Sequence, residues 1–288
     1  MRIYISIDME GVSGVTRWAD VVTAGQDYQR ARSWMTADVN AAIAGARGAA
    51  EEVEFVVEEN HGVEMLCNLL LDEIDPEVEV VRGQPRGGAT TAAALDESCD
   101  ALMLVGHHAK VGDYPGVCAH TISYGDYKDV RLHGRSVSEG EIFATIAAQV
   151  GVPTILIAGD DVVCAEMQKV CPGIEPVVVK RALSREAAAV IPPPRAQRLI
   201  AAGAERAVRR LRAGEVSAPD FVSPFAFEIE LKAPLSDEAR DAIAQRFPEF
   251  RVVGDHTVAF EHAEMAIAYR MAAITQFLAR QPRDVRSY

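Results

Sequence analysis

Two carboxylates near the start of the chain are the first residues whose spacing suggests chemistry. Asp8 and Glu10 follow the apolar segment IYISI, which is typical of a buried strand. Side chains two positions apart in a strand leave on the same face, about 6.5 Å apart at Cα. The segment itself offers no positive charge to neutralise them. We therefore expect cationic or metal partners, brought by other parts of the chain.

Imidazole groups follow two later strand-like segments. His61 comes directly after VEFVVEEN, and the adjacent pair His107 and His108 comes after ALMLVG. Because adjacent side chains diverge, we expect at most one of that pair to face a shared site. A single histidine is more often an ordinary core or surface residue than a ligand. The set of residues therefore matters more than any one of them.

One more histidine and two more acids follow in suggestive positions. His120 lies in PGVCAHT, and Glu139 and Glu141 lie in VSEGEIF at the expected start of a helix. Acids in the first turn also interact favourably with the helix dipole, which is a structural alternative for both. Imidazoles and carboxylates together are the ligand set of zinc and related ions. Several of each could hold two ions about 3.5–4 Å apart, with one carboxylate bridging them.

The order of strand-like and helix-like segments predicts where these groups meet. Apolar runs alternate with alanine-rich stretches from RIYISID to PTILIAG, with helices expected over 65–74 and 90–99 among others. Such alternation predicts an α/β fold whose mostly parallel sheet has helices on both faces. Sites in such sheets lie at the carboxyl ends of strands, where the residues above fall.

After about residue 180 the pattern changes. A proline-started basic helix, IPPPRAQRLIAAGAERAVRRLRAG, is followed by FAFEIELK, FRVVGDHTVAFE and a final helix, AEMAIAYRMAAITQFLA. The alternation in the two middle segments suits antiparallel strands with one solvated face. We therefore predict a catalytic α/β domain over residues 1–185 and a smaller α+β domain over residues 186–288.

Composition limits the binding partners and the cellular compartment that we expect for this protein. The formal net charge is −13, and Lys and Arg gather only in the short run RAVRRLR, so nucleic-acid binding is not expected. Five cysteines without a CxxC pair predict neither a disulfide framework nor a thiolate zinc site, which favours the cytoplasm. No apolar run approaches the roughly 18 residues of a membrane span, so we expect neither a signal peptide nor a membrane anchor.

Five motifs, in this order along one α/β chain, carry a family resemblance: IDMEGVSG, ENHG, VGHHA, PGVCAHT and VSEGE. The chain resembles the D-aminopeptidase family of dinuclear zinc peptidases, family M55, over essentially its whole length. The resemblance implies two Zn²⁺ per chain, with ligands at Asp8, Glu10, His61, His108 and Glu139. It also implies that Asp8 bridges the ions, that His120 is catalytic, and that the subunits form closed homo-oligomeric rings such as decamers, with the active sites facing an internal cavity.

Two positions depart from the family pattern. Glu59 stands two residues before His61, where family members usually carry an Asp that supports the metal-binding histidine. Whether Glu59 makes that supporting contact is therefore open. Ser138 stands where Gly often precedes the ligating glutamate, so Glu141 remains an alternative to Glu139.

The residues and the resemblance together predict hydrolysis of the N-terminal residue from short peptides or amino-acid amides. A metal-activated water would attack the scissile carbonyl, and His120 would assist as acid, base, oxyanion stabiliser or nucleophile. The sequence leaves the choice between D and L residues open. One alternative is a magnesium phosphatase of the haloacid dehalogenase type with Asp8 as nucleophile, since IDMEG and AGDD resemble its motifs. The other is a non-enzymatic peptide- or metal-binding protein.

Overall fold

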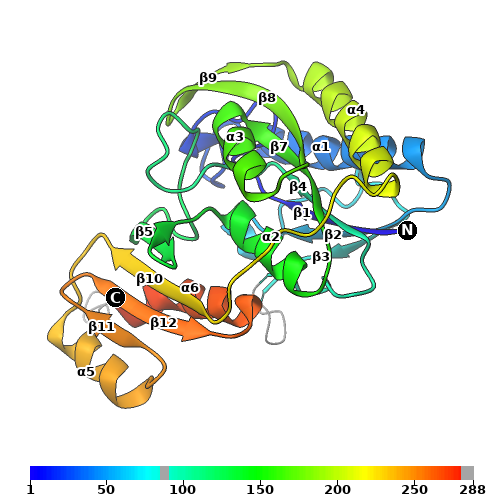
Figure 1. Cartoon of the computed structure of the whole chain (residues 1–288). Coiled ribbons are helices and arrows are strands. Elements are labelled where there is room, and N and C mark those ends of the chain that lie inside the picture. Colours follow the sequence, from blue (N-terminus) through cyan, green and yellow to red (C-terminus); the bar gives the residue numbers. More distant parts are fainter. Residues whose placement is uncertain (85–90, 280–288) are drawn as a thin grey trace.

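A seven-stranded sheet forms the larger layer of the molecule (Figure 1). The structure is a computed structural model that describes residues 1–84 and 91–279. The strand order is β3-β2-β1-β4-β7-β8-β9, and every neighbouring pair except β8 and β9 is parallel. The strands are β1 (Arg2–Ile7), β2 (Glu54–Glu59), β3 (Val78–Val81), β4 (Ala101–Val105), β7 (Thr154–Asp160), β8 (Glu175–Ser184) and β9 (Ala187–Val190). The predicted mostly parallel sheet is confirmed.

Successive residues of the buried strands point to opposite sides of this sheet, so apolar side chains emerge on both faces. Helices cover both faces. Ile3, Ile5 and Ile7 of β1 pack in the core shared with α1 (Tyr28–Ala49) and α4 (Pro193–Arg212). Tyr4 faces the opposite core, which contains residues of α2 (Glu139–Gln149) and α3 (Asp161–Val170). Burial on both faces explains why these strands are continuous apolar runs.

A five-stranded antiparallel sheet forms the smaller layer, in the order β11-β12-β10-β5-β6. Residues alternate in β10, so that Phe225, Phe227 and Ile229 are buried while Glu228 and Glu230 are partly exposed. The elements of this layer are β5 (Tyr127–Leu132), β6 (Arg135–Ser136), β10 (Phe225–Leu231), α5 (Asp237–Arg246), β11 (Arg251–Val253), β12 (Thr257–His262) and α6 (Met265–Ala279). The expected smaller α+β unit is therefore present.

The division into residues 1–185 and 186–288 stays a prediction. Strands β5 and β6 of the smaller sheet come from the first segment. Helix α4 comes from the second segment and packs against α1 on the larger sheet. The two helices approach closely at Gly45, where an added Cβ would lie 2.0 Å from the carbonyl oxygen of Ala201.

The helices expected over 65–74 and 90–99 are wrong, apart from residue 90, which lies outside the described residues. Apart from the 3₁₀ turn η2 (Val63–Met65), the described parts of both segments form turns and loops. Two buried glutamates at the end of β2 bind their amide groups. Glu59 accepts hydrogen bonds from the amides of Asn68 and Leu69, and Glu58 accepts them from those of Ala92 and Ala93. An amide bound in this way is not available for a hydrogen bond within a helix.

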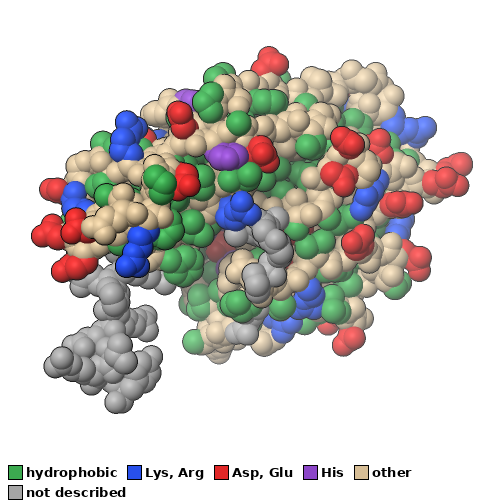
Figure 2. Space-filling view, turned by 90° about the horizontal axis from the view of Figure 1, so that it is seen from below, with side chains coloured by type: hydrophobic (Ala, Val, Ile, Leu, Met, Phe, Trp, Pro, Cys, Tyr) green, Lys and Arg blue, Asp and Glu red, His purple; other side chains and the backbone are tan. Residues whose placement is uncertain are grey.

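The surface carries charges of both signs. Figure 2 shows one face on which Lys and Arg side chains lie among acidic ones. Within residues 1–84 and 91–279, no helix is both long enough and apolar enough to cross a bilayer.

Candidate metal centre

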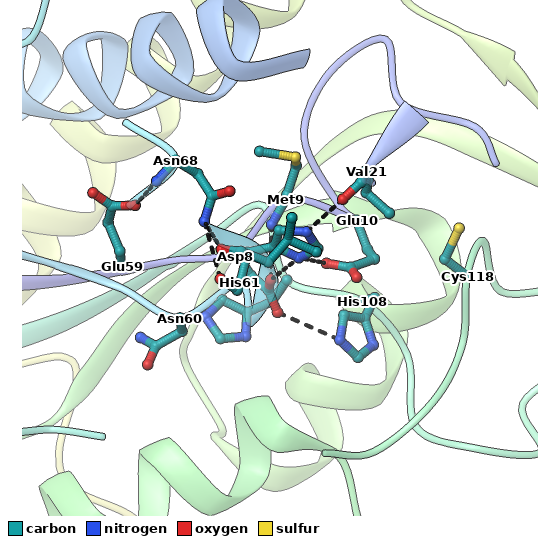
Figure 3. A network of polar contacts seen from close by, with 12 residues as sticks. Asp8, Met9, Glu10, Val21, Glu59, Asn60, His61, Asn68, His108 and Cys118 are labelled. Carbon is teal, nitrogen blue, oxygen red and sulfur yellow. Dashed lines mark hydrogen bonds and ion pairs between the residues drawn. The ribbon is translucent and has the colours of Figure 1, made fainter. Parts of the chain in front are cut away.

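Three neighbouring strands bring the predicted residues to one rim of the larger sheet. Strand β1 lies between β2 and β4, and all three run parallel. Ile7 pairs with Glu59 on one side and with Val105 on the other, so the three strands end at the same level. The residues that follow them, Asp8, His61 and His108, therefore meet (Figure 3).

Asp8 lies between the two histidines. Its Oδ1 atom is 3.6 Å from His61 Nδ1, and its Oδ2 atom is 3.4 Å from His108 Nε2. The side chain is nearly fully buried. Each carboxylate oxygen thus faces a different imidazole, which is the arrangement that a bridging ligand requires.

Glu10 reaches the same cluster by a close turn of the chain. Its Oε2 atom lies 3.0 Å from His61 Nδ1 (Figure 3). The amide of Gly11 donates to the carbonyl of Gly106 over 2.6 Å. A Cβ atom at Gly11 would lie 2.0 Å from the carbonyl oxygen of His107. The glycine of the DMEG motif is therefore needed for this approach of the two loops.

Glu139, the first residue of α2, completes the cluster. Its Oε1 atom is 3.5 Å from His108 Nε2 and 3.9 Å from His120 Nε2. The same oxygen accepts a hydrogen bond of 2.8 Å from the amide of Ile122. The carboxylate is thereby held towards the imidazoles.

Glu141 points elsewhere. It forms an ion pair with Arg135, one of whose contacts measures 2.9 Å. The hydroxyl of Ser138 accepts a hydrogen bond from the amide of Glu141 and so caps the helix. The structure thus brings Glu139, and not Glu141, to the other acids, and Ser138 has a capping role of its own.

Each of the three site histidines uses one ring nitrogen to contact a backbone carbonyl. The contacts are His61 Nε2 to Val21 at 2.7 Å, His108 Nδ1 to Ala109 at 3.0 Å and His120 Nδ1 to Cys118 at 2.9 Å. A carbonyl can only accept, so these nitrogens carry the hydrogen. The other nitrogen of each ring then faces the carboxylates, as a metal-binding imidazole does when its outer nitrogen is held by a hydrogen bond.

The buried acids and histidines strongly shift one another's pKa values. Burial alone would lower the pKa of His61, but the charge of Glu10 and the contact with Asp8 outweigh it and raise the pKa to about 10. Burial is likewise outweighed at His108, whose pKa is raised well above its usual value by Asp8 and Glu139. Burial would raise the pKa of Asp8, but His108 and His61 lower it well below the usual range. Without a bound cation, protons on the histidines balance the acids, and a metal would replace them.

The residues present fit a metal ion. The Nε2 atom of His108 is buried and has no hydrogen-bond partner among the described residues. Two sets of ligand atoms lie within 4.8 Å of one another, one from Asp8, Glu10 and His108 and one from His108, His120 and Glu139. Carboxylates and imidazoles, with one buried ring nitrogen that makes no hydrogen bond to a described residue, suit zinc or a related divalent ion.

His120 differs from the other two histidines. Burial and the charge of His108 lower its pKa. Its ring stacks on that of His108, with centroids 4.0 Å apart and 14° between the planes. The Trp18 ring meets its edge, with centroids 5.1 Å apart. His120 is therefore held as a neutral imidazole next to the acids.

A cavity of about 520 Å³ opens beside the cluster. Its polar end is formed by Asp8, Glu10, His61, His120 and Glu139. Its apolar wall includes Trp18, Met65, Tyr124, Tyr269 and Phe277. No sequence pattern identifies these wall residues, because they come from 3₁₀ turns, a loop and α6. A cavity of this size can hold a small organic ligand.

Two further residues near the motifs lie outside the cluster. His107 points away, with its Nε2 atom 2.9 Å from Ser6 Oγ, which agrees with the expectation that only one of the adjacent pair faces the site. Glu59 is linked to His61 through Asn68. It binds the amide of Asn68, whose side chain donates to the carbonyl of His61 over 3.0 Å (Figure 3).

Known proteins resemble both the sequence and the fold. A family model described as D-aminopeptidase, Peptidase_M55, matches residues 1–274. A D-aminopeptidase of Bacillus subtilis (strain 168) is 30% identical over 200 residues, which cover 69% of this chain and 71% of that protein. The solved structure described as "Zn-dependent D-aminopeptidase DppA from Bacillus subtilis, a self-compartmentalizing protease" is similar with a TM-score of 0.86 and 26% identity, over 98% of this chain and 99% of that chain. The chain therefore belongs to the D-aminopeptidase family, peptidase family M55.

Proposed function

We propose that this chain is a zinc aminopeptidase with two metal ions per subunit, which releases the N-terminal residue of short peptides or amino-acid amides. As a member of family M55, the chain is a metallo-aminopeptidase. The observation that carries the dinuclear proposal is the position of Asp8, whose two oxygens face His61 and His108 separately.

The proposed ligands divide into two halves around Asp8. Glu10 and His61 would hold one ion together with Oδ1 of Asp8. His108 and Glu139 would hold the other together with Oδ2. Bound zinc supplies Lewis acidity for the scissile carbonyl and lowers the pKa of a water ligand towards about 7.

His120 is the proposed catalytic residue. Its Nδ1 atom is held by the carbonyl of Cys118, so Nε2 is the nitrogen free to exchange a proton. The lowered pKa of His120, caused by burial and by His108, keeps this nitrogen unprotonated at neutral pH. We propose that Nε2 accepts a proton from the attacking water and returns it to the leaving amine.

The substrate would occupy the cavity beside His120. Its volume of about 520 Å³ suits a short peptide or an amino-acid amide. The relatives are described as D-aminopeptidases, and we extend a preference for N-terminal D residues to this chain.

The solved relative is described as a self-compartmentalizing protease. We propose that this chain also forms a closed homo-oligomeric ring, such as a decamer. We keep the cytoplasm as its proposed location, on the cysteine usage of the sequence.

The phosphatase alternative would need a lysine, for which Lys180 is the best candidate, and a late acid from AGDD, and the positions of these groups do not support it. The ammonium of Lys180 binds backbone carbonyls, and the carboxylate of Asp160 caps α3 and accepts from the amide of Val117. The lysine and the late acid of that alternative are thus bound to main-chain groups.

Elemental analysis of the purified protein, combined with hydrolysis assays, tests the proposed function. We expect about two zinc ions per chain and release of the N-terminal residue from D-aminoacyl amides and dipeptides, with their L counterparts as the matched comparison. Removal of zinc by a chelator should abolish the activity, and zinc should restore it. Magnesium-dependent release of phosphate, without peptide cleavage, would contradict the proposal.

A further inference from the structure

Lys180 is a fully buried lysine in β8, and its ammonium lies beneath the loop that follows β1. Its Nζ atom donates to the carbonyls of Glu10, Val12 and Val15 over 2.6, 3.0 and 2.7 Å. An ammonium has three donors, and here each has one acceptor. The lysine therefore acts as an internal cation that gathers three carbonyls of one loop.

A buried acid binds the same loop through its donors. Asp38 of α1 accepts from the amide of Ser13 over 2.8 Å and from its hydroxyl over 2.7 Å. Asp38 is almost fully buried. A cation from β8 thus holds three carbonyls of the loop, and an anion from α1 holds the amide and the hydroxyl of Ser13.

Asp8, which both halves of the proposed metal centre share, follows β1 directly. Beyond Asp8, this loop carries parts of only one half. Glu10 stands at its start, and its continuation brings the carbonyl of Val21 to His61 Nε2 at 2.7 Å. His108 and Glu139 come from other elements, after β4 and at the start of α2. Lys180 therefore holds the backbone of Glu10 directly. It affects the position of His61 indirectly, through the part of the loop that contains Val21.

We propose that Lys180, supported by Asp38, is a positioning residue for the metal ion held by Glu10 and His61, and not for the one held by His108 and Glu139. The inference rests on the two-metal function proposed above. Loss of the ammonium would leave three buried carbonyls without a partner, so the loop would have to rearrange. Groups that hold metal ligands in place commonly change metal affinity by about 10- to 100-fold when they are substituted.

Zinc titration in competition with a chromophoric chelator tests this inference, since it measures both affinities without reference to turnover. We expect Lys180→Met to bind one zinc as the unsubstituted protein does and the other about 10- to 100-fold more weakly. Asp38→Asn should weaken the same ion by a smaller factor. The matched control is Val179→Ala, which removes packing from the adjacent buried position of β8 and should leave both affinities unchanged.

The outcomes separate this inference from the proposed function. The positioning role would be overturned if Lys180→Met bound each ion as tightly as Val179→Ala does. It would also be overturned if Lys180→Met lost affinity for both ions equally. An unsubstituted protein that binds fewer than two ions would overturn the two-metal function, and the inference with it. If Lys180→Met does not fold, as judged by circular dichroism, Lys180→Gln gives the same readout.

Discussion

The two sheets of this protein treat charged side chains in opposite ways. On the smaller sheet, Arg131 lies 3.1 Å from Asp129, 3.0 Å from Glu228 and 2.9 Å from Glu230. These side chains are partly exposed, and the network contains its own cation. At the rim of the larger sheet, by contrast, the carboxylates of Asp8, Glu10 and Glu139 are buried beside imidazoles.

The difference separates charges that belong to a surface network from buried charges that need a compensating group beside them. A surface ion pair is solvated and contributes little to stability. Buried acids need compensating charge, which at the rim comes from protons on histidines unless a metal takes their place. Substitutions in either region test this difference.

The largest effect is expected from Asp8→Asn, because both proposed metal halves share this carboxylate. We expect loss of both zinc ions and a decrease in kcat/KM well beyond the roughly 100-fold typical of residues that only support ligands. Zinc content and hydrolysis of aminoacyl amides would be measured on the same preparation. A variant that keeps two ions would contradict the bridging role of Asp8.

His120→Ala should separate catalysis from metal binding. If His120 transfers the proton, kcat should fall by about 10²- to 10⁴-fold while both zinc ions remain. The exposed His133, whose Nε2 atom contacts the carbonyl of Val222, offers a control, and His133→Ala should leave kcat unchanged. Full turnover by His120→Ala would exclude the proposed role.

The two glutamates of VSEGE should respond differently. Glu139→Gln should weaken the zinc ion shared with His108, because its oxygen faces that ring at 3.5 Å. Glu141→Gln should keep both ions and lose only the contact with Arg135. Chelator competition on both variants decides the assignment, and the reverse result would move the ligand to Glu141.

Zinc affinity should rise with pH between about pH 6 and 9. In the metal-free protein the pKa of His61 is raised to about 10, and that of His108 is also raised. His61 is then protonated throughout this range, so zinc must displace its proton, and the raised pKa of His108 acts in the same direction. For each proton released, linkage predicts about a tenfold gain in affinity per pH unit. Calorimetric titrations in buffers of different ionisation enthalpy would count these protons, and a pH-independent affinity would count against the buried charge balance.

The smallest effect is expected in the surface network. Arg131→Met should lower the free energy of unfolding by about 1 kcal/mol or less, because its partners are partly exposed and the pairs are screened by salt. Thermal unfolding at low and high salt would measure it. A loss of zinc in this variant would show that the two regions are coupled.

Much of the fold follows from local pattern. Ile3, Ile5 and Ile7 form one apolar face and Tyr4 belongs to the other, so a strand buried on both sides is visible in the sequence. The failed helices over 65–74 and 90–99 have a different cause. Their leucines and alanines favour helix, but propensity is a weak preference that tertiary contacts override. Glu58 and Glu59, which bind amides of these segments, lie outside them at the end of β2.

The site was predictable in outline for a related reason. Strand order places Asp8, His61 and His108 together, because adjacent parallel strands end at one rim. The choice of Glu139 over Glu141 depends on where Arg135 lies, which the pattern of residues does not contain. The position of Lys180 beneath the first loop likewise depends on the packing of β8, far away in the sequence.

Anomalous X-ray scattering at the zinc absorption edge, from crystals of the protein as purified, tests the central assignment most directly. We expect two peaks, one beside Asp8 Oδ1, Glu10 and His61 and one beside Asp8 Oδ2, His108 and Glu139. Zinc peaks that lie away from Asp8, or the absence of any peak in zinc-loaded crystals, would contradict a two-zinc site at Asp8.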